Sequence, residues 1–203
     1  MQLLILETLC AFGASLFLCL IAIPLLKRAG SGQHILSYVK QHAGKEGTPT
    51  MGGLAFITAA VSVSLIFSQE ADKPFWVTIA VGLGYLVVGF LDDFLKKRRG
   101  NNLGLRAYQK IIFQLAVAAM AATFCCLEGL TILRIPYTDL VYDIGWWMCP
   151  LGIFVFVATV NGVNLTDGLD GLAGGTCSVF FLALSLLLMV QGSGALSDLC
   201  LCL

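Results

Sequence analysis

The sequence predicts an all-α integral membrane protein, a polytopic helix bundle in which residues 1–203 form a single transmembrane domain. Of the 203 residues, 58% are hydrophobic and only 12% are charged, whereas a soluble domain is about 25% charged. Several apolar runs approach the roughly 20 residues that a helix needs to cross a bilayer. The eight cysteines form no Cys-x-x-Cys pair, so we interpret them as small apolar packing residues rather than metal ligands.

About six transmembrane helices are expected, at residues 3–26, 52–67, 75–91, 111–127, 145–163 and 172–190. Gly82, Gly84 and Gly89 in the third helix suit close helix contacts in lipid. Glu7 lies near the start of the first helix and is expected to reach the membrane interface.

The segments between these helices carry weaker signals. Residues 35–39 have apolar side chains on one face and favour a short interfacial helix. Residues 128–144 favour a structured external loop with a small hairpin, and the pair Trp146–Trp147 is typical of a membrane interface. Residues 191–203 are expected to form a short tail.

Lysine and arginine lie mostly on one side of the predicted bundle. The loops after the first, third and fifth helices carry all but two of the twelve cations, namely Lys27, Arg28, Lys40, Lys45, Lys96, Lys97, Arg98, Arg99, Arg106 and Lys110. Because cytoplasmic loops are enriched in Lys and Arg, these loops are predicted to face the cytoplasm and the N-terminus to lie outside. Three polar segments fall on this face: residues 45–53, residues 92–96 and residues 161–173.

Asp92 and Asp93 directly follow an apolar run and precede the four cations of residues 96–99. On a helix these neighbours diverge by about 100°, so one would face a metal or a reacting group while the other binds Lys96 or orients its neighbour. Carboxylates are unfavourable at a helix C-terminus, which carries partial negative charge, so a divalent cation or the four bases must compensate. A solvated helix end neutralised by these bases is the alternative without a function.

The third polar segment is rich in glycine and contains two amides and two carboxylates. Asp167 and Asp170 are three residues apart, as are Asn161 and Asn164, so each pair shares a face if the segment is helical. Glycines such as Gly168 let the backbone approach a ligand closely. A polar pocket is therefore predicted here rather than a plain surface loop.

The first polar segment places Thr48 and Thr50 on either side of a proline, before two glycines, and Lys45 supplies a cation. This combination suits a phosphate or a polar head group, but alone it is a weak signal. Asp pairs without clustered His or Cys favour Mg²⁺ or Mn²⁺ over zinc. Together, the three segments suggest Mg²⁺-assisted phosphoryl transfer between a diphosphate substrate and a lipid.

These motifs resemble those of the polyprenyl-phosphate N-acetylhexosamine-1-phosphate transferase family over nearly the whole chain. The matching stretches are Gly-Thr-Pro-Thr-Met-Gly-Gly (47–53), Gly-Phe-Leu-Asp-Asp-Phe-Leu-Lys (89–96), Asn-Leu-Gly-Leu with a later Gln-Lys (102–110), and Asn-x-x-Asn-Leu-Thr-Asp-Gly-Leu-Asp-Gly-Leu-Ala (161–173). The form of the first stretch points to the muramoyl-pentapeptide branch of this family.

The resemblance implies a multi-pass transferase of the bacterial cytoplasmic membrane that acts in peptidoglycan synthesis, and hence in cell-wall biogenesis, cell shape and cell division. Undecaprenyl phosphate would attack UDP-MurNAc-pentapeptide with Mg²⁺ as cofactor, giving lipid I and UMP. Direct attack and an aspartyl-phosphate intermediate both fit the motifs. The resemblance also implies a homodimer in the lipid bilayer and no nucleic-acid partner.

Residue roles are carried over position by position from the resemblance. Asp92 resembles the carboxylate that deprotonates or orients the lipid phosphate, and Asp93 resembles its acidic partner near Mg²⁺ and Lys96. Thr48 is expected to bind substrate through its hydroxyl. The remaining substrate-binding positions, which line the nucleotide-diphosphate and uridine wall, are Lys45, Thr50, Asn161, Asn164, Asp167, Gly168, Leu169 and Asp170.

The chain departs from the family in its number of spans. Family members have about ten, with a further aspartate that binds Mg²⁺ and a His-rich cytoplasmic loop, whereas the only histidines here are His34 and His42. We therefore expect an N-terminal portion of a longer protein that is inactive by itself. One alternative is a sister transferase that uses UDP-N-acetylglucosamine. A transporter or channel is another, although the acidic motifs lie at helix ends rather than at the bilayer midplane.

Overall fold

A computed structural model describes residues 2–29, 50–67, 71–99, 104–135, 137–167 and 171–203. Its elements are α1 (Gln2–Arg28), α2 (Gly53–Phe67), α3 (Lys73–Arg99), α4 (Ala107–Leu127), β1 (Ile132–Arg134), β2 (Val141–Asp143), the 3-10 helix η2 (Gly145–Trp147), α5 (Met148–Thr166), α6 (Leu172–Val190) and α7 (Gly194–Cys202). Five helices are long and apolar enough to cross a membrane, and α2 is a shorter apolar helix. This confirms the all-α membrane bundle. The interfacial helix expected at residues 35–39 lies outside the described residues.

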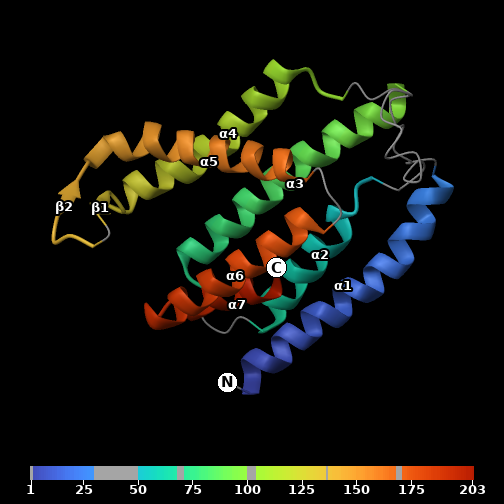
Figure 1. Ribbon diagram of the computed structural model, residues 1–203, viewed down its shortest axis with the longest axis horizontal. Coiled ribbons are helices and arrows are strands. Elements are labelled where there is room, and N and C mark those ends of the chain that lie inside the picture. Colours follow the sequence, from blue (N-terminus) through green and yellow to red (C-terminus); the bar gives the residue numbers. More distant parts are fainter. Residues whose placement is uncertain (1, 30–49, 68–70, 100–103, 136, 168–170) are drawn as a thin grey trace.

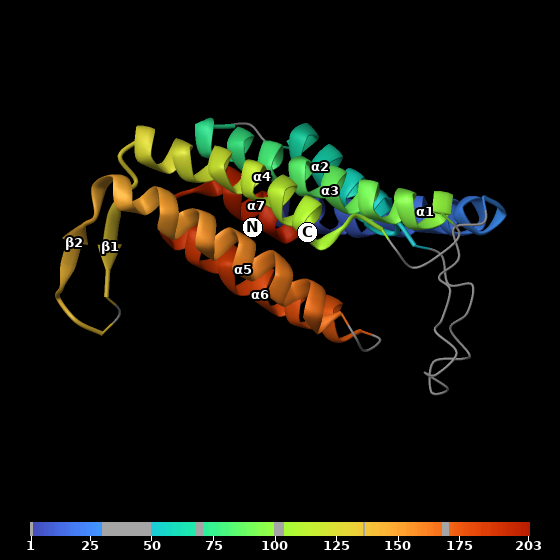
Figure 2. The ribbon, with the colours of Figure 1, turned by 90° about the horizontal axis from the view of Figure 1, so that it is seen from above.

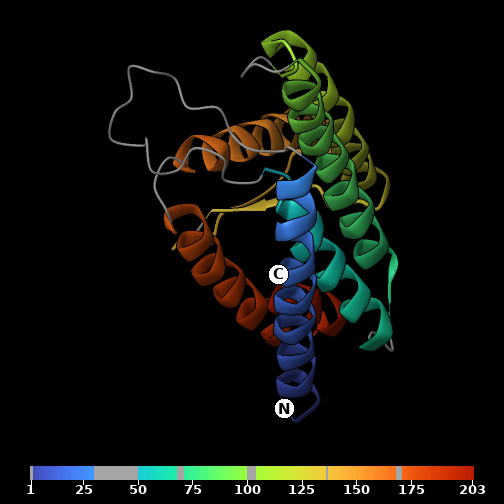
Figure 3. The same cartoon turned by 90° about the vertical axis from the view of Figure 1, so that its right-hand side faces the viewer.

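The helices pack mainly in sequence-adjacent pairs, α1 with α2, α3 with α4, α4 with α5, and α6 with α7. Figure 1 shows the C-terminal ends of α1 and α3 and the N-terminal end of α2 directed toward the same side, away from the β-hairpin. Seen from above, α5 and α6 lie on one side of α7, and α2, α3 and α4 lie on the other (Figure 2). Figure 3 shows that α5 and α6 diverge from each other, starting at the C-terminal end of α5 and the N-terminal end of α6.

Small residues allow the close helix contacts that hold a bundle together in lipid. A Cβ added at Gly84 of α3 would lie 3.1 Å from the side chain of Val117 of α4, and one at Gly152 of α5 would lie 3.2 Å from that of Ala122 of α4. The expectation of close contact is therefore confirmed for Gly84. It is wrong for Gly82 and Gly89, where a Cβ would meet nothing within 4 Å, because both glycines line a cavity described below.

Residues 191–203 are not a tail, because Gly194–Cys202 form α7, which packs against α1, α2, α3 and α6. Leu199 is buried together with Phe75 and Ile79 of α3. The hydroxyls of Ser185 in α6 and Ser197 in α7 lie 2.9 Å apart, and each lies 3.1 Å from the backbone oxygen of the other residue, so the two hydroxyl protons are shared among these acceptors. A helix of this length is too short to be recognised as a span, but its small and polar residues pair with partners on neighbouring helices.

The expected interfacial position of Glu7 is also wrong. Its side chain is buried, with 1% of the residue exposed. The Cys202 thiol at the end of α7 donates to Glu7 Oε1 at 3.5 Å. Because α7 covers this part of α1, the carboxyl group faces a neighbouring helix rather than the membrane surface.

Helix α3 extends well beyond the apolar run that predicted it. Its 27 residues span about 40 Å, which exceeds the roughly 30 Å thickness of the hydrocarbon core. Asp92 and Asp93 therefore lie inside the helix, about two turns before its end at Arg99, and the expectation that they close the helix is wrong. The helix end instead carries the four basic residues 96–99, whose positive charges interact favourably with the partial negative charge of the helix C-terminus.

The hairpin expected within residues 128–144 is confirmed. Strands β1 and β2 pair antiparallel, with Leu133 opposite Tyr142. The Asp143 carboxylate accepts hydrogen bonds from the Thr131 hydroxyl at 2.6 Å and from the Gly145 N–H at 2.9 Å. These contacts fix the point where the hairpin returns to α5.

Candidate active site

A cavity of ≈ 860 Å³ is lined by residues from α2, α3, α4 and α5. It contains polar residues from each of the three segments that the sequence placed on one membrane face: Thr50, Asp92, Asp93, Lys96, Asn164 and Asp167. Lys110 of α4 adds a second cation. The rest of the wall includes apolar side chains such as Ile57, Leu86 and Phe90. The cavity thus has both a charged part and an apolar part.

Lys96 bridges the two adjacent carboxylates. Its Nζ lies 2.7 Å from Asp92 Oδ2 and 3.2 Å from Asp93 Oδ1. These contacts need spacings of four and three residues on a continuous helix, which the extension of α3 provides. The side chains are partly shielded, with 14% of Asp92, 27% of Asp93 and 38% of Lys96 exposed. Lys96 therefore neutralises much of the negative charge of Asp92 and Asp93, for which the sequence analysis expected a nearby cation.

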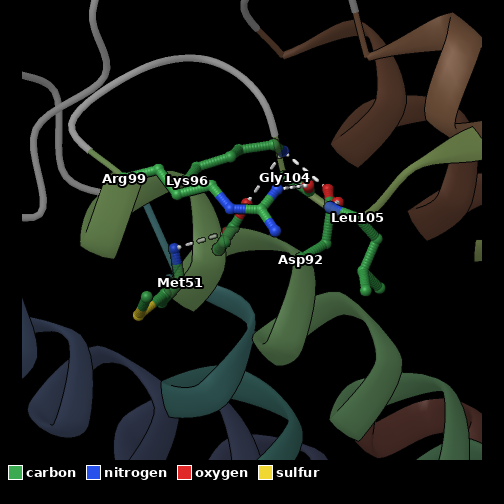
Figure 4. A network of polar contacts seen from close by, with 7 residues as sticks. Met51, Asp92, Lys96, Arg99, Gly104 and Leu105 are labelled. Carbon is green, nitrogen blue, oxygen red and sulfur yellow. Dashed lines mark hydrogen bonds and ion pairs between the residues drawn. The ribbon is translucent and has the colours of Figure 1, made fainter.

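The second oxygen of each carboxylate accepts a backbone N–H from a different connecting segment (Figure 4). Leu105 N–H donates to Asp92 Oδ1 at 2.8 Å, and Met51 N–H donates to Asp93 Oδ2 at 3.2 Å. Met51 has a φ of 70°, a left-handed conformation that costs a non-glycine residue about 1–2 kcal/mol. Met51, two residues before the start of α2, is thus held in an unusual conformation at the place where its N–H contacts Asp93.

The start of α4 fits against Asp92 because residue 104 is glycine. A Cβ at Gly104 would overlap Asp92 Oδ1 and would lie 2.9 Å from both Asp92 Cγ and its backbone oxygen. Arg99 donates to the Gly104 carbonyl oxygen at 2.9 Å. The Gln109 side chain accepts the Arg106 N–H at 3.1 Å, and this contact stabilises the first turn of α4. Lys110, in the same turn, lines the cavity.

A buried glutamine joins the three helices beside the cavity. Gln114 of α4 is 1% exposed, and its Oε1 accepts a hydrogen bond from the Asn161 amide of α5 at 2.8 Å. Its backbone oxygen accepts the Tyr85 hydroxyl of α3 at 3.3 Å, and the Tyr85 ring stacks on Phe156 of α5 with centroids 6.5 Å apart. These contacts hold the C-terminal end of α5 near α3.

The structure brings together some of the predicted substrate-binding residues but not all of them. Asn164 and Asp167 line the cavity, and Asn164 lies on α5 rather than in a loop. Asn161 is not among the cavity residues, and its amide contacts Gln114 and the Val157 carbonyl. Five predicted residues lie outside the described part of the chain: Lys45, Thr48, Gly168, Leu169 and Asp170.

Several residues of the site could not be assigned a role from the sequence. Met51 and Leu105 act through backbone N–H groups, so their side-chain types give no signal. Gly104 and Lys110 do belong to the third matching stretch, residues 102–110, but no role was assigned to them from the sequence.

A metal centre built only from protein side chains is not found within residues 50–67, 71–99, 104–135, 137–167 and 171–203, where no three His, Cys, Asp or Glu side chains cluster. Mg²⁺ usually keeps water and binds through one or two carboxylates plus substrate phosphates. Asp93 and Asp167 both line the cavity and offer the oxygen atoms that Mg²⁺ prefers. The carboxylates of Asp93 and Asp167 are therefore side chains of the cavity that could bind a Mg²⁺.

Comparisons with known proteins identify the family of the chain. The family model described as Glycosyl transferase family 4 matches residues 75–203, and Phospho-N-acetylmuramoyl-pentapeptide-transferase signature 1 matches residues 45–57. Proteins named phospho-N-acetylmuramoyl-pentapeptide-transferase are similar to the chain. The one from Oceanobacillus iheyensis is 40% identical over 91% of the chain, the one from Bacillus subtilis 39% over 92%, and the one from Desulforamulus reducens 42% over 90%.

The chain covers 58%, 59% and 57% of the lengths of these three relatives, respectively. The matched family model begins at α3 and includes the Asp92–Asp93 pair and the whole of α4, α5 and α6. The matched signature includes the Met51 segment that contacts Asp93. The chain belongs to glycosyl transferase family 4, which confirms the resemblance found in its motifs.

Proposed function

We propose that the protein containing this chain transfers phospho-MurNAc-pentapeptide from UDP-MurNAc-pentapeptide to undecaprenyl phosphate, releasing lipid I and UMP. The observation that carries the proposal is the cavity, which is lined both by the bridged carboxylates with Lys96 and Lys110 and by apolar residues of α2 and α3. The name of the relatives, phospho-N-acetylmuramoyl-pentapeptide-transferase, supports the choice of the muramoyl-pentapeptide substrate.

In this reaction an oxygen of the lipid phosphate attacks the sugar-linked phosphorus of the nucleotide substrate. A new P–O bond forms, and the bond from that phosphorus to the oxygen bridging the two phosphates breaks. UMP leaves with the bridging oxygen and the electron pair. The product keeps a diphosphate linkage, now between the lipid and the sugar.

The side chains of the cavity can contribute to this reaction by positioning and by charge. Asp92 is proposed to orient the attacking lipid phosphate and to accept its proton if the phosphate arrives protonated. Lys96 and Lys110 are proposed to attract the phosphate oxygens, as cations do in phosphoryl transfer. Asn164 and Asp167 are proposed to contact the nucleotide half, and the apolar residues from α2 and α3 to contact the polyprenyl chain.

The charges of the cavity support a requirement for Mg²⁺. Among the described residues that line it, Asp92, Asp93 and Asp167 carry three negative charges, against two positive charges on Lys96 and Lys110. A diphosphate and a lipid phosphate add further negative charge, so a divalent cation would favour binding. We propose that Asp93 holds Mg²⁺ together with the substrate phosphates. When bound, the ion would polarise the phosphoryl oxygens.

The test uses the full-length protein in detergent with undecaprenyl phosphate and UDP-MurNAc-pentapeptide, and it measures UMP release and lipid I formation. We expect release that requires Mg²⁺ and that excess UDP-N-acetylglucosamine does not inhibit. Preferred turnover of UDP-N-acetylglucosamine would assign the protein to the sister activity instead, and no release from either substrate would refute the proposal. We also propose that residues 1–203 expressed alone release no UMP. Turnover by that chain would show that its own residues complete the site.

A further inference from the structure

We propose that Arg99, Gly104 and Leu105 are positioning residues that fix the carboxylate of Asp92 through a single peptide unit. The inference deepens the proposed function, because it concerns how Asp92 is aimed at the lipid phosphate. It rests on three observations around the segment between α3 and α4.

The first observation is that both oxygens of Asp92 are engaged, in two different directions. Oδ2 lies 2.7 Å from Lys96 Nζ, one helical turn further along α3. Oδ1 accepts the Leu105 N–H at 2.8 Å, from a residue beyond the end of that helix. Two contacts at the two ends of a carboxylate fix its plane as well as its position. Hydrogen bonds to a charged group are also stronger than those between neutral groups.

The second observation is that one peptide unit lies between two opposite charges. The carbonyl oxygen of Gly104 accepts from the Arg99 guanidinium at 2.9 Å, while the N–H of the same unit, which belongs to Leu105, donates to Asp92 at 2.8 Å. The peptide dipole is thus aligned from the cation to the anion (Figure 4). Hydrogen bonds in such a chain polarise one another, so Arg99 acts on Asp92 without touching it.

The third observation is that the peptide unit can approach this closely only because residue 104 is glycine. Gly104 is buried, and an added Cβ would overlap Asp92 Oδ1. The Asp92 backbone oxygen, 2.9 Å from that Cβ, belongs to a helix and cannot move aside. An alanine would therefore push the 104–105 peptide unit away from Asp92 or rotate the carboxylate away from Lys96.

The experiment compares Gly104→Ala, Arg99→Ala and Arg99→Lys in the full-length protein. The matched controls are Gly13→Ala, where an added Cβ meets nothing within 4 Å, and Arg98→Ala, which removes the same charge from the exposed neighbouring residue. The first readout is kcat and KM for the UDP-sugar. The second is the hydrogen exchange rate of the Leu105 amide, for which Asp92→Ala is added to the set and no substrate is needed.

We expect Gly104→Ala and Arg99→Ala to lower kcat by about 10²-fold, the loss typical of small misplacements of a reacting group, with KM changed less than about threefold. Arg99→Lys should recover most of kcat, because lysine can still donate to the Gly104 carbonyl. Leu105 amide exchange should accelerate about tenfold or more in Asp92→Ala and Arg99→Ala. Both controls should resemble the wild type.

Unchanged exchange at Leu105 in Asp92→Ala, or wild-type kcat in Gly104→Ala, would overturn the proposal. If Gly104→Ala does not fold, the Arg99 pair and the exchange rates decide it. If the wild type releases no UMP from any UDP-sugar, the proposed function fails. The exchange comparison then still shows whether the peptide unit holds Asp92.

Discussion

Lys96→Met should destabilise the protein, because it leaves two adjacent carboxylates without the cation that pairs with them. The substitution keeps most of the aliphatic stem but removes the ammonium group that lies 2.7 Å from Asp92 Oδ2 and 3.2 Å from Asp93 Oδ1. Breaking a buried ion pair by removing one partner costs about 3–5 kcal/mol, whereas an exposed pair contributes about 0–1 kcal/mol. Because 38% of the Lys96 side chain is exposed, we place the loss between these limits, at about 2 kcal/mol.

The assay is thermal unfolding of the full-length protein in detergent, with Lys97→Met as the control because Lys97 is the exposed neighbour of the same charge. For a protein of about 150–250 residues about 1 kcal/mol corresponds to about 2–4 °C in Tm, and the shift is smaller for a longer chain, so Lys96→Met should lower Tm of the full-length protein by at most about 4–8 °C. Adding Asp93→Asn to Lys96→Met should restore part of the loss, since it removes one of the two repelling charges. Equal Tm values for Lys96→Met and Lys97→Met would refute the bridging role.

Three further outcomes are expected. Asp92→Asn should lower UMP release by about 10²–10⁴-fold with little change in Tm, and wild-type turnover by this variant would exclude Asp92 from the reaction. Gln114→Leu removes the acceptor of the Asn161 amide and should cost about 1–2 kcal/mol in thermal unfolding, part of which Asn161→Leu should restore if the contact is responsible. The Thr131 hydroxyl and a backbone N–H hold the pKa of Asp143 below its usual value. The hairpin should therefore have this stabilisation above about pH 4 and lose it as the pH falls through the lowered pKa. Tryptophan fluorescence should show a weaker pH dependence in Thr131→Val, and an identical pH profile would exclude the contact.

The long helices could be predicted from the sequence because apolar run length is set by the bilayer. Residues 172–190 were predicted with the bounds that α6 has in the structure. Helix ends in the polar regions could not be placed in this way. Helix α3 continues to Arg99 and α5 to Thr166, since hydrogen bonding along a helix continues through polar residues that leave the membrane. Helix α7 was missed because its burial depends on partners in α1, α2, α3 and α6.

The candidate site was predictable in part of its side chains but not in its backbone contacts. The sequence predicts that carboxylates and cations lie together on one membrane face, because Asp92 and Asp93 directly precede the basic residues 96–99. The N–H groups of Met51 and Leu105 could not, because every residue except proline has such a donor. Gly104 was the available clue, since a glycine within a matching stretch often marks a close approach of the backbone.

The extension of α3 and the neutralisation of its carboxylates depend on each other. If the helix had ended at Asp92 and Asp93, the partial negative charge of its C-terminus would have added to theirs. Continuing for about two turns moves the helix end to basic residues, brings Lys96 onto the face of both carboxylates, and lets Arg99 reach the Gly104 carbonyl. A substitution that ends the helix early, such as Leu95→Pro, should therefore remove all three effects together. Thermal unfolding of that variant should show a larger loss than that of Lys96→Met, and an equal loss would mean that the ion pairs alone hold this end of the helix.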